Sequence, residues 1–351
     1  MSVSPPARAV VVWCDLGPQI GVGHLMRCLA LAEELAGRGR EVVFLADASS
    51  VPFARDQLAA RGFRSVPPPA TEAEQLALVA SLAPEAVVVD SYRLPPSTYA
   101  ALHASYRTLA IVDGEIGERE ADVYLDQNIG SEGDPRALPA GAADAVRLAG
   151  LRYSLMRRDI LRRRPDDPDA HAEATPLRVL AFFGGTDGFG AAPVATAALI
   201  GTGKPFALTV VAAGETSRAA LEALQPGPGQ QIDVISPTDR IAEMVTAADL
   251  VVSAAGTSSW ELLCLGAAVA FVCVADNQEE SYGRIAAQEL CFPLGKLSAM
   301  RADPTAATEV LRTALTDAGA RSALRRRGWE LVDGAGGARV ADRLLGPDAL
   351  I

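Results

Sequence analysis

The sequence predicts an α/β protein built from two parallel β-sheets, each covered by helices on both faces. Short runs rich in Val, Ile and Leu alternate with helical patterns along the whole chain. Continuous apolar strands separated by helices are typical of parallel sheets. The same order of elements starts twice, near residue 9 and again near residue 177. The chain is therefore expected to form two similar halves.

The individual elements follow from two periodicities. Short aliphatic runs predict strands at residues 9–13, 41–45, 86–89, 108–112 and 123–125 in the first half, and at 177–183, 207–212, 232–235, 249–253 and 269–274 in the second. Apolar residues that recur every three or four positions predict helices at residues 24–37, 70–82, 96–104, 191–199, 217–224, 241–247, 260–265 and 279–289. A last helix is expected at residues 337–345, after a Gly-rich break.

These elements group into an N-terminal domain at residues 1–160 and a C-terminal domain at residues 176–351. Between them, residues 161–175 contain prolines and charges of both signs without periodicity, which is typical of an exposed linker. Each domain starts with an apolar strand, a Gly-rich turn and a helix. The chain thus resembles a tandem of two Rossmann-like domains.

The composition excludes several classes of protein. Lys and Arg number 32 against 43 Asp and Glu, and the resulting net charge of −11 disfavours nucleic acid or an anionic membrane as a partner. Five cysteines without a C-x-x-C pair favour buried thiols in a reducing compartment over disulfides or zinc sites. No apolar run is long enough to span a bilayer or to form a signal sequence. A cytoplasmic location is expected.

The strongest local signal is the segment I-G-V-G-H-L-M-R at residues 20–27. Gly21 and Gly23 allow the backbone to turn tightly after the strand and to approach a ligand. The helix that follows directs its free N–H groups into the same space. His24 lies in its first turn, where a neutral imidazole can take a proton from water or a hydroxyl. A histidine that merely caps a helix would give the same pattern.

A dinucleotide-binding motif is an alternative for this segment. That motif requires G-x-G-x-x-G, and its third position is Met26 here. Asp47, at the end of the second expected strand, fits the acid that would bind the ribose. His24, however, would crowd a pyrophosphate beside the second glycine, which disfavours this alternative.

A second signal is S-A-A-G-T-S-S-W-E at residues 253–261, directly after a strand. The donors that this loop offers to a phosphate come from Gly256, Thr257, Ser258 and Ser259. Glu261 can accept from ribose hydroxyls, although an acid that only stabilises a helix N-terminus would look the same. Two further polar segments, 184–187 and 276–278, follow strand ends, where ligands of open parallel sheets usually bind.

Together these segments resemble the nucleotide-sugar hydrolases of pseudaminic acid biosynthesis and the related spore-coat polysaccharide proteins (PseG/SpsG-like). The matching features are Asp15, residues 20–27, V-D-S-Y at 89–92, G-L-R-Y-S-L-M-R at 150–157, G-G-T-D at 184–187, residues 253–266, N-Q at 277–278 and D-G-A-G at 333–336. They run in family order from about residue 10 to about residue 340. The resemblance therefore covers nearly the whole chain.

The resemblance implies a glycosyltransferase-B-like fold with a cleft between two Rossmann-like domains and the final helix packed back on the N-terminal one. It implies cleavage of a UDP-linked amino sugar by water, with neither metal nor cofactor, and His24 as the catalytic base. The lipid II-forming N-acetylglucosaminyltransferase is a more distant relative whose nucleotide-binding Glu corresponds to Glu261. Asp15 is expected to orient the imidazole or to bind the sugar.

Substrate and nucleotide are expected to contact a defined set of residues at the strand ends. These residues are Gly21, Gly23, Arg27, Asp90, Tyr92, Gly185, Thr186, Asp187, Gly256, Thr257, Ser258, Ser259, Glu261, Asn277 and Gln278. Two other functions stay open: a glycosyltransferase of the same fold, with a sugar, lipid or small-molecule acceptor in place of water, and a nucleotide-sugar-binding protein without turnover.

Two positions depart from the pattern of the family. The family usually has Arg two residues before Asp15, where this chain has Trp13, and a pair of aspartates where it has Asp113 and Gly114. The loss of an Arg near the sugar would indicate a different or less anionic substrate.

Overall fold

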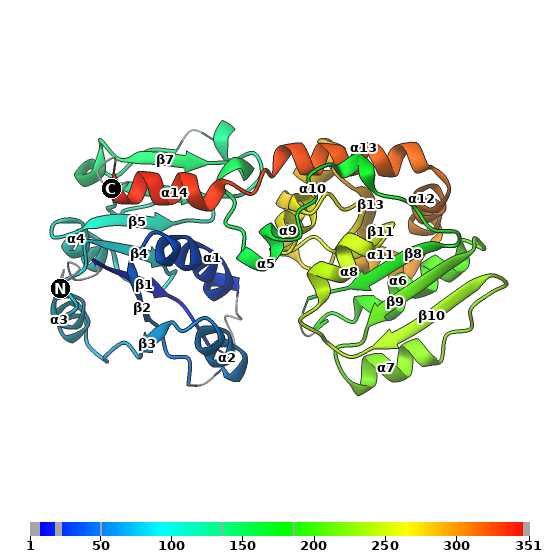
Figure 1. The fold of residues 1–351 in the computed structure, drawn as a ribbon, viewed down its shortest axis with the longest axis horizontal. Coiled ribbons are helices and arrows are strands. Elements are labelled where there is room, and N and C mark those ends of the chain that lie inside the picture. Colours follow the sequence, from blue (N-terminus) through cyan, green and yellow to red (C-terminus); the bar gives the residue numbers. More distant parts are fainter. Residues whose placement is uncertain (1–7, 18–22, 50, 135, 185–186, 347–351) are drawn as a thin grey trace, which may run out of the picture. The chain divides into compact units, whose positions relative to one another are not determined.

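The computed structural model describes residues 8–17, 23–49, 51–134, 136–184 and 187–346. It divides into two compact units (Figure 1). The first unit joins Met1–Arg158 to Gly334–Ile351, and the second consists of Asp159–Asp333. Each unit contains one parallel sheet with helices packed against it. The predicted α/β fold with two Rossmann-like sheets is therefore confirmed.

The sheet of the first unit has, within the described residues, seven parallel strands in the order β3-β2-β1-β4-β5-β6-β7. The strands are β1 (Ala9–Cys14), β2 (Glu41–Leu45), β3 (Arg64–Val66), β4 (Ala86–Asp90), β5 (Arg107–Ile111), β6 (Val123–Asp126) and β7 (Val146–Ala149). The strand order reverses between β1 and β4, and this topological switch point is where open α/β sheets bind ligands. The sequence does not predict β3 and β7, which are short strands at the two edges of the sheet.

Helices cover both faces of this sheet. They are α1 (Gly23–Gly37), α2 (Pro52–Ala60), α3 (Glu72–Ser81), α4 (Pro96–His103) and α14 (Gly336–Leu345). The short helix α5 (Arg158–Leu161) begins at the last residue of the first segment and continues into the second unit. Alternate residues of β1 point to opposite faces: Val10 and Val12 pack in the cluster that contains α1 and α14, whereas Val11 and Trp13 pack with α4. The sheet is thus buried on both sides, as its continuous apolar strands predict.

The second unit repeats this arrangement with, within the described residues, six parallel strands in the order β10-β9-β8-β11-β12-β13. The strands are β8 (Leu177–Phe182), β9 (Phe206–Val211), β10 (Gln230–Ile235), β11 (Leu250–Ala254), β12 (Val269–Cys273) and β13 (Phe292–Lys296). The helices are α6 (Ala191–Gly201), α7 (Glu215–Glu222), α8 (Ile241–Ala247), α9 (Ser259–Cys264), α10 (Glu279–Ala287), α11 (Leu297–Ala302), α12 (Thr305–Thr316) and α13 (Ala318–Leu331). Its switch point lies between β8 and β11.

Residues 161–175, expected as a linker, lie within the second unit. The Arg164 guanidinium stacks 4.0 Å from the ring centroid of Trp329 on α13. Glu173 pairs with Arg321 and Arg325 of the same helix, and His171 Nε2 lies 2.8 Å from a carboxylate oxygen of Asp249. These contacts hold the segment against α13 and the residue that precedes β11.

Helix α14 packs against α1 of the first unit, although more than 290 residues separate them in the sequence (Figure 1). Val340, Ala341 and Leu344 are at most 1% exposed and belong to the core cluster of that unit. Arg38, directly after α1, donates to Asp342 at 2.6 Å and to the carbonyl of Ala338 at 3.1 Å. The end of the described chain is therefore a structural part of the first unit.

The start of α14 depends on a glycine. A Cβ atom at Gly336 would lie 2.2 Å from the Ser154 carbonyl oxygen, which is backbone and cannot move aside as a side chain can. At the next position, Gly337, a Cβ would lie 3.8 Å from the Glu34 side chain, which is ordinary van der Waals contact. The two neighbouring glycines therefore form a matched pair for substitution.

We expect Gly336→Ala to lower the free energy of unfolding by ~1–3 kcal/mol, since overpacking forces the backbone apart. Gly337→Ala should be neutral or stabilising, because Ala exceeds Gly in helix propensity by ~1 kcal/mol. Urea denaturation of both variants measures the difference. Equal stability of the two would contradict the close approach of α14 to Ser154.

Candidate active site

The candidate site lies at the carboxyl ends of the strands of the first unit, beside the switch point. His24 is the second residue of α1, which follows β1, and Asp90 is the last residue of β4. The two strands pair in parallel with Cys14 opposite Asp90, so both chain segments leave the sheet at the same place. This pairing brings together two residues that are 66 positions apart in the sequence.

The imidazole of His24 is held by a buried carboxylate. Nδ1 of His24 lies 2.6 Å from Oδ1 of Asp90, whose side chain is only 1% exposed. A contact this short between a ring nitrogen and a carboxylate oxygen requires a proton between them, so we assign the proton to Nδ1. Nε2 makes no hydrogen bond within the described residues and carries the lone pair of the neutral ring. The arrangement suits a general base that accepts its proton at Nε2.

Arg27, one turn further along α1, binds the same carboxylate. Its Nε and Nη2 atoms each lie 2.6 Å from an oxygen of Asp90, and Nη1 lies 2.8 Å from Asp113. Burial alone would lower the pKa of Arg27, but the two aspartates raise it well above its ordinary value. Cys28 adds a thiol donor 3.5 Å from Asp90, and burial raises the pKa of that thiol. Asp90 therefore has a complete set of donors that fixes its orientation.

Asp113 collects donors from three elements. Besides Arg27 it accepts from the Tyr92 hydroxyl and, at 3.0 Å, from the Asn128 amide. Burial alone would raise the pKa of Asp113, but Arg27 and the hydrogen bonds from Tyr92 and Asn128 lower it to about 2. Asn128 also donates to Asp126 at 2.9 Å, and burial raises the pKa of Asp126. A continuous polar network thus runs along the carboxyl ends of β4, β5 and β6.

Tyr92 covers one side of the imidazole. Its ring meets that of His24 edge to face, with centroids 4.9 Å apart, and the side chain is 55% exposed. Burial, with the neighbouring Asp113, raises the pKa of the phenol, so it remains a hydrogen-bond donor. The expected substrate-binding residues Arg27, Asp90 and Tyr92 therefore all lie together with His24.

The expectation that Asp15 orients the imidazole is corrected by the structure. Asp15 accepts from the Ser91 hydroxyl at 2.8 Å and from the Tyr92 backbone N–H at 2.9 Å. It fixes the loop after β4, whereas Asp90 holds His24. Trp13 is 4% exposed and packs with Val11 in the core. The side chain at this position therefore lies in the core.

The second unit presents its own loops at the carboxyl ends of β11 and β12. The backbone N–H groups of Thr257 and Ser258 make no hydrogen bond within the described residues, and neither does the buried Ser259 hydroxyl. Gln278, in the short helix η5 (Asp276–Gln278), accepts from the Val274 N–H at 3.1 Å. A Cβ at Gly256 would lie 3.5 Å from its Nε2 atom, so the two loops are adjacent.

The remaining expected residues of the second unit lie around these loops. Asn277 is exposed beside Gln278, and Glu261 is half-buried in the first turn of α9. Asp187 accepts from the N–H groups of Ala191 and Ala192 at 2.8 and 3.0 Å, so its carboxylate caps α6. In the first unit, Gly23 is the first residue of α1. The other calls, Gly21, Gly185 and Thr186, lie outside the described residues.

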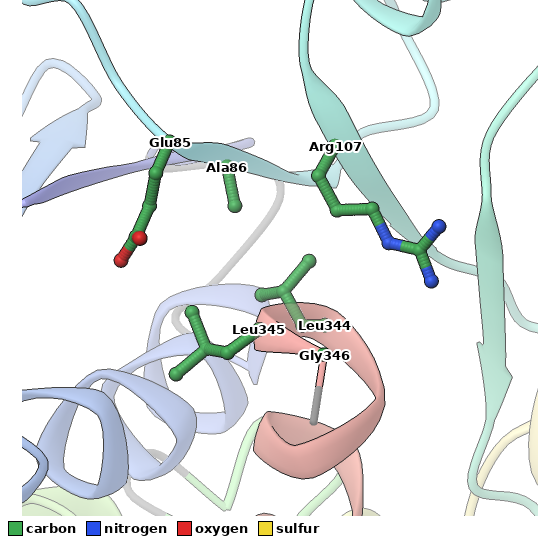
Figure 2. Close-up of a pocket in the computed structure, with 6 residues that line it drawn as sticks. All are labelled: Glu85, Ala86, Arg107, Leu344, Leu345 and Gly346. Carbon is green, nitrogen blue, oxygen red and sulfur yellow. The ribbon is translucent and has the colours of Figure 1, made fainter. Parts of the chain in front are cut away.

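A cavity of about 360 Å³ opens at the amino ends of the strands of the first sheet (Figure 2). It lies where β4 and β5 begin, between Glu85, Arg107 and the end of α14 at Leu344 and Leu345. The polar network of His24 lies at the far ends of these strands. The cavity therefore contributes no side chain to the candidate site.

The described part of the chain lacks two further features. In that part, no group of three or more His, Cys, Asp and Glu side chains is arranged to hold a metal ion. No helix among those residues combines the length and the apolar character that crossing a membrane requires.

Comparison with known proteins identifies the fold. No protein-family model matches the sequence, and no curated protein sequence matches it. Solved structures do: MurG of Acinetobacter baumannii aligns with a TM-score of 0.70 and 16% identity over 97% of this chain and 99% of its own. The spinosyn rhamnosyltransferase SpnG aligns with a TM-score of 0.62 and 16% identity, over 95% of this chain and 98% of its own. The calicheamicin glycosyltransferase CalG4 gives 0.59 and 14% identity, over 97% and 98%.

The chain therefore has the glycosyltransferase-B fold, which confirms the fold that the motifs imply. These likenesses extend over whole chains at low identity. They identify the architecture, whereas the activity has to be inferred from the chemistry of the site.

Proposed function

We propose that this chain is an enzyme that transfers a sugar from a nucleotide-sugar to a hydroxyl group that His24 deprotonates. The observation that carries the proposal is the His24–Asp90 pair, because it leaves Nε2 as a proton acceptor at the switch point of the first sheet. The expected acceptor is a sugar or a small molecule with a free hydroxyl.

The structural neighbours support transfer over hydrolysis. SpnG is a rhamnosyltransferase whose structure was also solved with thymidine diphosphate, and CalG4 is a glycosyltransferase. Hydrolysis of the nucleotide-sugar is the second candidate, and the motif at residues 20–27, with its resemblance to nucleotide-sugar hydrolases, favours it. The two reactions use the same base and differ only in whether the hydroxyl belongs to an acceptor or to water.

The mechanism follows from the position of the proton on Nδ1. Nε2 takes the proton of the acceptor hydroxyl as its oxygen attacks the anomeric carbon of the sugar. The bond between that carbon and the phosphate oxygen breaks, and the nucleoside diphosphate leaves with the electron pair. Asp90, hydrogen-bonded to Nδ1, stabilises the imidazolium that forms. Neither metal nor cofactor enters these steps.

The nucleotide is assigned to the second unit, at the carboxyl ends of its strands β11 and β12. The N–H groups of Thr257 and Ser258 and the Ser259 hydroxyl, which have no hydrogen-bond partner among the described residues, suit phosphate oxygens, which accept several donors at once. Glu261 is assigned to the ribose hydroxyls, and UDP is the expected nucleotide. This assignment gives the segment that follows β11 the role of binding the nucleotide.

Glu261→Ala should weaken UDP binding roughly ten- to a hundredfold, since a hydrogen bond to a charged group contributes ~1.5–3 kcal/mol. Titration calorimetry with UDP measures the affinity. Glu222→Ala, which removes a 58%-exposed carboxylate from α7, is the matched control and should bind as the original protein does. Unchanged UDP affinity in a folded Glu261→Ala variant would refute the assignment.

The decisive experiment measures release of nucleoside diphosphate from UDP- and TDP-sugars, with and without hydroxyl-bearing acceptors. Release that depends on an acceptor identifies a transferase, and release with water alone identifies a hydrolase. In either case, the release of diphosphate should persist in EDTA. If the protein binds the nucleotide-sugars but releases no diphosphate under any of these conditions, it binds without turnover and the proposal fails.

A further inference from the structure

Arg27 is shared between two carboxylates, and only one of them touches the imidazole. Two of its nitrogens bind Asp90, and the third binds Asp113 at 2.8 Å. Nη2 of Arg27 also lies 3.2 Å from Nδ1 of His24. A guanidinium this close to the ring opposes its protonation, since like charges repel strongly at short range.

The charges of this cluster explain how the imidazole can still accept a proton. With a neutral ring, the cluster holds one cation, Arg27, and two anions, Asp90 and Asp113, so its net charge is −1. Protonation of His24 brings the net charge to zero. Without Asp113, the neutral-ring cluster would have no net charge, and protonation would leave it at +1.

The other ionisable groups of the surrounding network come from each neighbouring element. Besides Asp90 they are Asp15 after β1, Arg27 and Cys28 on α1, Tyr92 after β4, Asp113 after β5 and Asp126 at the end of β6. Cys28 and Tyr92 act as neutral donors, because burial raises the pKa of both. Asp15 is bound to the loop after β4. Asp113 is therefore the anion that balances Arg27 on the side away from Asp90.

We propose that Asp113 is a positioning residue that sets the proton affinity of His24 through Arg27. It draws part of the guanidinium charge away from the imidazole and, with Tyr92 and Asn128, fixes the plane in which Arg27 binds Asp90. The inference rests on the proposed role of His24 as the base. It adds a residue that makes no hydrogen bond to the imidazole.

Asp113 can play this part throughout the working pH range. Its pKa of about 2 keeps it ionised wherever an imidazole titrates. Its side chain is 30% exposed, against 1% for Asp90, so its removal costs less in folding than the removal of Asp90. An Asn at this position removes the charge and keeps one oxygen acceptor, which can face Arg27 and Asn128, while its NH2 group replaces the oxygen that accepts from Tyr92.

The test is Asp113→Asn, observed by NMR of the histidine ring nitrogens in the full chain without substrate. We expect the midpoint of the His24 titration to move to lower pH by roughly half a unit, the effect of one charge several ångströms away in a partly solvated site. The acidic limb of the pH–rate profile should move by the same amount. Asp113→Glu should restore both.

Asp122→Asn is the matched control. Asp122 lies just before β6, at the amino ends of the strands of the same sheet. Its carboxylate accepts from the Thr108 backbone N–H and lies 3.4 Å from Nδ1 of His103. This variant should shift the titration of His103 and leave that of His24 in place. An unchanged His24 midpoint in folded Asp113→Asn, or an equal shift in Asp122→Asn, would overturn the inference. If the ring midpoint moves but the acidic limb of the activity does not, Asp113 tunes the ring as inferred and the proposed role of His24 as base fails.

Discussion

Replacing His24 by Asn should lower kcat by roughly 10²–10⁴-fold, the usual contribution of a general base, while nucleotide binding stays unchanged. Asn cannot accept the proton of the hydroxyl, but it keeps a polar group beside Asp90. The loops assigned to the nucleotide belong to the second unit and contain none of the altered contacts. The measurement combines steady-state kinetics with calorimetric titration of the nucleoside diphosphate.

His103→Asn is the control for this substitution. His103 ends α4 and lies 3.3 Å from the Thr108 hydroxyl, at the amino end of β5 and thus at the other edge of the sheet. Its loss should leave kcat within a factor of two. Activity of His24→Asn close to that of the original protein would show that another group takes the proton.

Asp90→Asn should have the second largest effect, because it acts on both catalysis and stability. An amide can offer its N–H to Nδ1, which would favour the tautomer with the proton on Nε2 and remove the base; in the serine protease triad the corresponding change costs ~10⁴-fold in kcat. We expect a loss of ~10²–10⁴-fold here. The variant also leaves buried Arg27 with Asp113 as its remaining carboxylate, at a cost of up to ~3 kcal/mol in the free energy of unfolding.

Comparison with Asp15→Asn distinguishes the roles of the two aspartates, Asp15 and Asp90, at the carboxyl ends of β1 and β4. Asp15 binds Ser91 and the backbone of Tyr92, so its replacement should loosen the loop and reduce kcat by less than about tenfold. Kinetics and urea denaturation of both variants give the answer. An equal loss of kcat from the two substitutions would show that Asp90 has no special role in orienting the imidazole.

The fold could be predicted from the sequence wherever an element is buried and regular. The central strands β1, β2, β4, β8 and β11 are apolar runs, and their period identifies them. The edge strands β3, β7 and β13 lack this signal, whereas the edge strand β10 carries it at residues 232–235. β13 contains Pro293 and Gly295, which disfavour strands in general, and an edge position tolerates the proline because one side of the strand needs no partner.

The site could be predicted only in part. The G-x-G-H segment identified His24, because the chemistry of that residue is visible in its own sequence neighbourhood. The role of Asp90 depends on the register of β1 against β4, which no local pattern contains. Asp113 and Asn128 were missed as site residues for the same reason. Asp113 follows the end of β5, and Asn128 follows the end of β6. The carboxyl end of a parallel strand is where ligands usually bind, so this position was the signal that could have identified both residues, as it identified Asp90 at the end of β4.

The packing of α14 makes the order of synthesis different from the order of assembly. The second unit is one continuous stretch, Asp159–Asp333, whereas the first needs residues from both sides of that stretch. On a ribosome, the second unit can complete its fold while the apolar surface of α1 still awaits Val340 and Leu344. A gene fragment that ends at residue 158 would encode His24, Asp90 and Asp113 but leave this surface uncovered. The second unit is consequently the part suited to separate expression, and the first would require its two segments to be joined by a short engineered connection.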